Sequence, residues 1–177
     1  PKQAQSLDPS AYLAAIGPDV MVPATRAFRD RSVELAAALA VATEPADAQA
    51  AFVESMLQWQ ELEVLQVGPA AAVGSPAGGE GLRDRIYSWP TVDPCAVDTF
   101  VASGAASDAT FFEEALVDDY GLDALEQLLF SGPDPVCGDW GGLSAAEVDA
   151  RRLAHARLLA ADVTAAANAL VVAWEGD

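Results

Sequence analysis

Two carboxylates near the middle of the chain have the spacing of a site that could bind a cation or transfer a proton. Asp123 and Glu126 lie three residues apart in the stretch 120–132, a short helical pattern between two glycines. At about 100° per residue, this spacing places both carboxylates on one face of one helical turn. Phe130 falls between them on that face, which predicts that the face is buried. Buried carboxylates need a cation, a metal or hydrogen-bond donors; the alternative is a core helix whose acids reach solvent through a gap.

The residues around these two acids predict a buried helix that follows an acidic segment. The helix is apolar over a wide arc, which is typical of a helix packed in the interior; the arc contains Leu122, Ala124, Leu125, Leu128 and Leu129. Six acids fall between Glu113 and Glu126. Such a run is usually a solvated face, and the alternative is a site for a hard cation, since Ca²⁺ favours carboxylate oxygens.

Length and charge set the class of protein. The chain has 177 residues, enough for one domain, 1–177, with a sizeable core. It is 52% hydrophobic with long alanine runs, which favour helix, and its net charge is −18. That charge repels phosphate backbones and anionic membranes, so nucleic acid is not an expected partner. No apolar run approaches the ~20 residues of a membrane span, so no transmembrane segment is predicted.

Helical periodicity predicts three long helices, near residues 9–42, 46–66 and 144–175. The last begins at a Ser-x-x-Glu capping box, Ser144 to Glu147. No useful alternation typical of a strand occurs, so we predict an all-α antiparallel helical bundle. Glycine, proline and serine mark flexible loops at 67–81 and 131–143.

The two cysteines, Cys95 and Cys137, both lie in proline- and glycine-rich segments. An even, sparse count in such settings indicates one disulfide, which would imply an oxidising compartment. The alternative is two independent thiols.

Four pieces of the sequence, in order along the chain, together resemble the imelysin family, also called insulin-cleaving membrane protease-like proteins. They are Val-Met-Val-Pro at 20–23, Trp-Gln-Glu-Leu-Glu…Gly-Pro at 59–69, Arg-Ile-Tyr-Ser-Trp-Pro at 85–90 and Gly-Leu-Asp-Ala-Leu-Glu…Phe at 121–130. The last piece occupies the place of the family's Gly-x-His-x-x-Glu motif. Family members are longer, so the resemblance implies the N-terminal half, or a fragment, of such a protein. The opening without methionine likewise suggests a processed or truncated product.

The main departure from the family pattern is Asp123, which stands where the motif has histidine, whereas Gly121 and Glu126 carry over. An aspartate supplies only oxygen, which disfavours a zinc-type site and leaves a harder cation, iron or calcium. The ligands expected for such an ion are Asp123, Glu126 and Glu63.

We predict that the two motif acids face an interior polar pocket. Glu63 and Trp59 of the second helix are expected to line it, and Arg85 is the candidate counter-ion. Two like charges one turn apart repel strongly in a medium of low dielectric, so a cation, an internal arginine or a shared proton must relieve them.

The only histidine, His155, lies on the apolar stripe of the last helix. It reads as a core-edge residue, and the alternative is that it replaces the missing ligand of the motif. With one histidine, the His-Glu-x-x-His helix of metallopeptidases cannot be built, and no Ser-His or Cys-His pairing is suggested.

These observations favour a binding protein over an enzyme. The resemblance implies an extracytoplasmic, non-catalytic protein associated with metal or iron uptake. The alternatives are a peptidase of the insulin-cleaving type and a partner-docking lipoprotein module. The expected partners are a metal ion, an extracytoplasmic protein or the second half of the same protein. The expected location is the periplasm or cell surface, as an outer-membrane lipoprotein whose signal and anchor lie outside this sequence.

Overall fold

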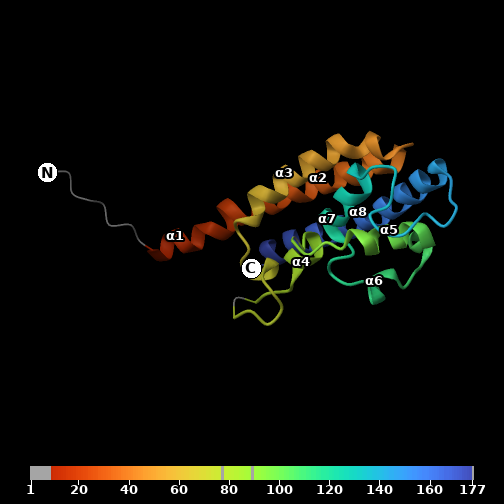
Figure 1. Cartoon of the computed structure of the whole chain (residues 1–177). Coiled ribbons are helices and arrows are strands. Elements are labelled where there is room, and N and C mark those ends of the chain that lie inside the picture. Colours follow the sequence, from red (N-terminus) through yellow and green to blue (C-terminus); the bar gives the residue numbers. More distant parts are fainter. Residues whose placement is uncertain (1–8, 77, 89, 177) are drawn as a thin grey trace.

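The described part of the chain is built from helices. The computed structural model describes residues 9–76, 78–88 and 90–176, and no strand occurs among them, so the all-α prediction is confirmed. The long members are α2 (Val22–Val41), α3 (Gln49–Glu63) and α8 (Ala145–Glu175), and α2 packs against both of the others (Figure 1). The shorter α-helices are α1 (Pro9–Ile16), α4 (Leu82–Ile86), α5 (Pro94–Ser103), α6 (Phe111–Glu114) and α7 (Gly121–Phe130).

The first long arm is one continuous path of α1, a π-helical turn and α2. The turn spans Gly17–Met21 and contains the Gly-Pro pair at 17–18. Pro18 cannot donate a backbone hydrogen bond, and the wider π turn accommodates this loss without ending the helix. None of the residues of α1 is buried, and α1 projects from one end of the bundle (Figure 1).

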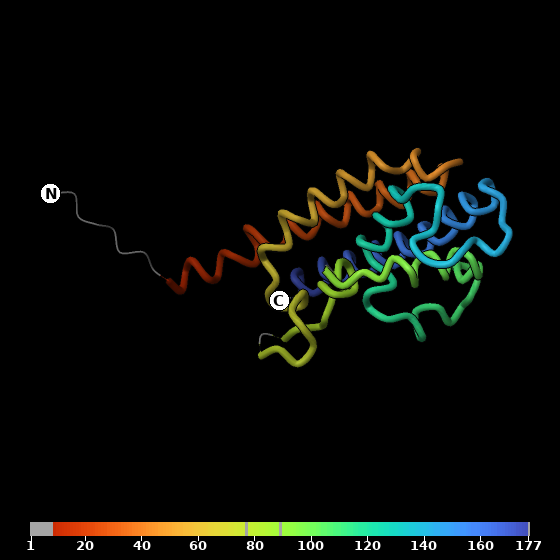
Figure 2. The backbone as a smooth tube through the Cα atoms, in the orientation of Figure 1, coloured from red at the N-terminus to blue at the C-terminus, as the bar shows by residue number. Residues whose placement is uncertain are grey.

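The three long helices form an antiparallel arrangement around α2. A short 3-10 turn, Pro45–Ala48, joins α2 to α3 and reverses the chain (Figure 2). The C-terminal end of α8 lies beside the start of α2, where Arg26 and Glu175 form an ion pair at 2.7 Å. Arg157 of α8 donates hydrogen bonds to the carbonyls of Leu39 and Ala42, both at 2.9 Å. Both carbonyls lie at the C-terminal end of α2, where the Leu39 carbonyl also accepts a hydrogen bond from the N–H of Ala42 at 3.3 Å. Arg157 therefore both supports the end of α2 and fastens it to α8.

The central helix α7 lies inside the bundle and packs chiefly against α8. Its apolar side is fully enclosed, as its periodicity predicts; Leu122, Ala124, Leu125, Leu128 and Leu129 are each 2% exposed or less. Burying a leucine side chain contributes about 1.5–3 kcal/mol. This short helix is therefore held in place by packing rather than by its own propensity.

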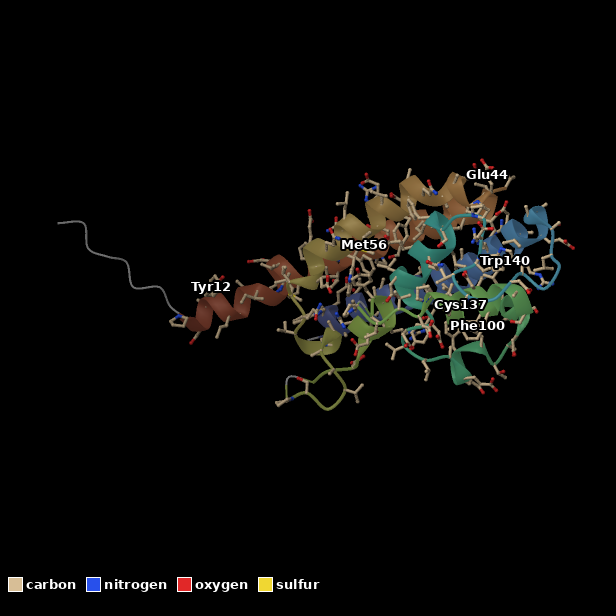
Figure 3. All side chains as sticks on the ribbon, in the orientation of Figure 1. Tyr12, Glu44, Met56, Phe100, Cys137 and Trp140 are labelled. Carbon is tan, nitrogen blue, oxygen red and sulfur yellow. A yellow bond between two sulfur atoms is a disulfide. The ribbon has the colours of Figure 1, made fainter. Side chains whose placement is uncertain are left out.

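The predicted disulfide between Cys95 and Cys137 is present, with Cα atoms 5.2 Å apart. It fastens the loop at 131–143 to the first turn of α5. The buried carboxylate of Asp98 strengthens this attachment, because it accepts a hydrogen bond from the backbone N–H of Val136 at 2.7 Å. Phe100, Cys137 and Trp140 gather at the end of the bundle opposite Tyr12 of α1 (Figure 3).

The last helix differs from the prediction in one respect. Within the described chain, α8 is long and apolar enough to cross a membrane by length and composition, with a mean hydropathy of 1.5 over its most apolar window, of which 44% is buried. The prediction rested on the absence of an unbroken apolar run, and in α8 a few charged residues interrupt the apolar ones. The same residues pack against α2 and α7, so the absence of a transmembrane segment stays a prediction.

Candidate functional site

Asp123 lies inside the bundle, in the first turn of α7, and is 4% exposed. One carboxylate oxygen accepts a hydrogen bond from the hydroxyl of Ser88 at 2.7 Å, and the other accepts one from the backbone N–H of Ala124 at 3.1 Å. Burial raises the pKa of Asp123, while the hydrogen bonds from Ser88 and the backbone oppose that rise. Asp123 is therefore a buried carboxylate with hydrogen-bond donors, as predicted.

Glu126 and Phe130 are placed differently from the prediction. Glu126 is exposed, and Phe130 is 45% exposed, with its ring edge against Phe52 at a centroid distance of 5.5 Å. The expectation of two buried carboxylates under a buried phenylalanine is thus wrong for these two residues. The reason is that α7 is enclosed on its leucine side, so the acidic face turns outward and only its first turn, with Asp123, is covered by the segment that contains Ser88.

Gly121 begins α7 in a conformation that other residues rarely adopt, with φ of +90°. A Cβ atom at this position would lie 2.8 Å from the carbonyl oxygen of Ile86. Glycine is therefore required both by the backbone angle and by the close approach of α7 to the end of α4. This approach places Asp123 within reach of Ser88, two residues beyond Ile86.

The arginine nearest the predicted acids is Arg83, and the expectation for Arg85 as their counter-ion is wrong. Arg85 forms a bidentate ion pair with Asp162 of α8, with one contact at 3.0 Å. Arg83 lies 3.6 Å from the carboxylate of Glu63 and 2.8 Å from that of Asp84, and its charge also lowers the pKa of Asp123. Two residues apart on a helix, the two arginines point about 200° apart, so only one of them can face α3 and α7.

The pKa of Tyr87 is affected by all three predicted acids. Burial raises the pKa of its phenol, and the charges of Glu126, Glu63 and Asp123 raise it further, while Arg83 opposes them. The three predicted carboxylates, from α3 and α7, therefore all lie near enough to influence the same phenol. Trp59, the other predicted lining residue, is 1% exposed and packs in the core against Phe28 at 5.0 Å.

The arrangement of these acids does not fit a metal ion held by this chain alone. Among the described residues no group of three or more His, Cys, Asp or Glu side chains could hold one. Both oxygens of Asp123 already accept hydrogen bonds, and Glu63 faces Arg83. Iron or calcium at Asp123, Glu126 and Glu63 accordingly stays a prediction, and no chemical step is assigned to a metal.

One known protein family matches most of the chain. The Imelysin (Peptidase_M75) family model matches residues 21–177. The chain belongs to the imelysin family. No curated protein and no solved structure matches it significantly. Imelysin proteins are generally extracytoplasmic.

Three residues of this imelysin site were missed from the sequence: Arg83, Tyr87 and Ser88. The last two lie in the segment 85–90, one of the four pieces that resemble the family. A serine and a tyrosine beside a short helix are a weak signal, because only the approach of α4 to α7 makes them partners of Asp123. Trp89 of the same segment lies outside the described residues.

His155 of this imelysin chain is a core residue. It is fully buried on α8, between the rings of Phe100 and Phe111 at centroid distances of 6.0 and 5.0 Å. Within the described chain neither ring nitrogen has a hydrogen-bond partner. These apolar surroundings agree with the interpretation of His155 as a packing residue. No acidic side chain is among these contacts, so they give no support to the alternative, in which His155 replaces the missing ligand.

We expect His155 to make the folded protein less stable in mild acid. Burial lowers the pKa of its imidazole to about 4, whereas a histidine in an unfolded chain titrates near 6.5. Between these values the unfolded chain binds a proton that the folded chain does not, so the free energy of unfolding falls as the pH falls from about 6.5 toward 4. The loss across this window is of the order of 3 kcal/mol, measurable by urea unfolding at a series of pH values.

The control is His155→Phe, which keeps a ring in the aromatic cluster and removes the titrating group. Its stability should fall less between pH 7 and pH 4.5 than that of the wild type. Burial raises the pKa values of Asp119 and Asp123, which has the opposite effect on stability in acid, but both residues are present in both proteins. If the stabilities of the two proteins fell equally with pH, His155 would not be the cause of the loss of stability in acid.

Proposed function

We propose that this imelysin chain is a non-catalytic, extracytoplasmic binding module, associated with metal or iron uptake through a partner that it binds. The uptake association rests on the family resemblance. The binding role rests on the chemistry of the site and on the surface beside it.

The observation that carries the proposal is the replacement of the motif histidine by a buried aspartate. Asp123 accepts hydrogen bonds at both oxygens, so it is satisfied as a structural group rather than left open toward a substrate. The only histidine of the chain, His155, is enclosed by aromatic rings on another part of α8. The site therefore lacks the imidazole that would act as an acid or base near neutral pH.

The proposed location is the periplasm or the cell surface, as part of an outer-membrane lipoprotein. The disulfide supports an oxidising compartment. The net charge of −18 favours solubility in the aqueous phase over contact with anionic lipid.

Incubation of the purified protein with insulin and with fluorescein-labelled casein tests the absence of catalysis. We expect no cleavage above the buffer rate, read by mass spectrometry and by fluorescence. Cleavage that is lost in Asp123→Asn and in Glu126→Gln, but kept in the surface control Glu61→Gln, would overturn the proposal in favour of the peptidase alternative. Thermal unfolding with added calcium or iron(III) tests the cation hypothesis, since a rise in Tm that Asp123→Ala with Glu126→Ala abolishes would place an ion at these carboxylates.

A further inference from the structure

The helix α3 has two apolar stripes, and only one of them faces the core. Phe52, Trp59 and Leu62 are buried against the bundle. Val53, Met56 and Leu57 form a second stripe, which Gln60 continues at the spacing i, i+3, i+4 and i+7. Val53 is 44% and Leu57 53% exposed. Met56 is partly buried against the core, whereas the exposed Val53 and Leu57 do not belong to it. An exposed apolar edge at helical spacing has the form of a surface that receives another helix.

This stripe is one wall of a depression of about 500 Å³, whose other wall is formed by Tyr87, Glu126 and Phe130. Met56 on α3 marks its position in Figure 3. Glu126 and Phe130 also line a neighbouring depression of about 360 Å³, which reaches Asp123. The two depressions therefore form one surface on either side of Glu126 and Phe130, which we call the α3–α7 groove.

The charge of the α3–α7 groove is negative and incompletely balanced. The carboxylate of Glu126 is exposed and forms no ion pair or hydrogen bond within the described residues. Asp123 and Glu63 act on the same Tyr87 hydroxyl as Glu126 does, and the arginine that opposes them, Arg83, also faces Asp84. A positively charged group at Glu126 would balance this excess of negative charge. A second copy of this chain, with its net charge of −18, would instead increase the excess.

We propose that the α3–α7 groove binds a helical segment of a partner protein that carries apolar side chains on one face and a lysine or arginine beside them. The apolar side chains fit between Met56, Leu57 and Phe130, and the cation pairs with Glu126. This inference rests on the proposed binding function and specifies the partner of the same site.

The probe is a fluorescein-labelled peptide of leucine and lysine, with leucines at i, i+3, i+4 and i+7, titrated with the full chain and followed by fluorescence anisotropy. Two matched pairs of variants at exposed positions test the groove. Leu57→Ser should weaken binding about tenfold, because anchors near the centre of a contact contribute most of the affinity, whereas Val172→Ser on α8, 68% exposed, should change Kd less than about twofold.

The second pair removes one charge from each variant. Glu126→Gln should weaken binding about three- to tenfold and reduce its dependence on salt, whereas Glu114→Gln, at an exposed position on α6 outside the groove, should leave Kd nearly unchanged. Equal effects within the apolar pair would show that the exposed edge of α3 is not the contact, and equal effects within the charged pair would show that binding reflects only the net charge of the chain. Either result would overturn the proposal. A leucine–glutamate peptide of the same pattern that binds as tightly would overturn the cationic part of the inference.

Two further measurements separate this inference from the proposed function. Mass spectrometry of the peptide after titration detects cleavage, which would refute the non-catalytic role and leave the effects of the variants on Kd readable. Sedimentation of the wild type and of Leu57→Ser measures self-association. A dimer that Leu57→Ser dissociates would identify a second copy as the occupant of the groove and overturn the proposal.

Discussion

Reduction of the Cys95–Cys137 disulfide is expected to lower the free energy of unfolding by about 4 kcal/mol. The bond closes a loop across a sequence separation of 42 residues, and removing it frees the unfolded chain to adopt many more conformations. The folded state also loses the attachment that keeps the 131–143 loop on α5, where Asp98 accepts the hydrogen bond from Val136. Urea unfolding with and without a phosphine reductant measures the difference.

The matched control for reduction is Cys95→Ser with Cys137→Ser. This variant should unfold at the midpoint of the reduced wild type and should not respond to the reductant. Titration of the denatured, unreduced wild type should find no free thiol. A reduced wild type that unfolds at the same urea concentration as the oxidised protein would contradict the expected contribution.

Gly121→Ala is expected to destabilise the protein by about 3 kcal/mol. A side chain at a φ of +90° is strained. In addition, its Cβ would lie 2.8 Å from the Ile86 carbonyl oxygen, a backbone atom that can move only if α4 moves. Because α4 also presents Arg83 and leads into Ser88, the relaxation would separate both residues from Asp123. The midpoint of urea unfolding measures the loss of stability.

Gly132→Ala is the matched control, since this glycine follows α7 and a Cβ there would have nothing within 4 Å. Its stability should stay within about 0.5 kcal/mol of the wild type. If the two alanine variants proved equally stable, the close approach of α7 to α4 would not require glycine. The site at Asp123 would then owe its geometry to other contacts.

The sequence by itself determined the features that depend on neighbours along the chain. The capping box at Ser144 and Glu147 predicts the start of α8, and it forms with reciprocal hydrogen bonds. The leucines of α7 predict its buried side. The ordered pieces at 20–23, 59–69, 85–90 and 121–130 were sufficient to identify the family. In each case the relevant interaction spans a few residues, so composition and spacing record it directly.

Only the tertiary structure decided which charged groups meet. Arg83 and Arg85 are nearly indistinguishable in the sequence, yet the orientation of α4 directs the first toward Glu63 of α3 and the second toward Asp162 of α8. In the same way Asp123 is buried under Ser88, while Glu126, one turn later on α7, stays at the surface. An ion pair or a buried carboxylate depends on how each helix is rotated about its axis against its neighbours. That rotation results from the packing of residues distant in the sequence, so the spacing within one helix does not contain it.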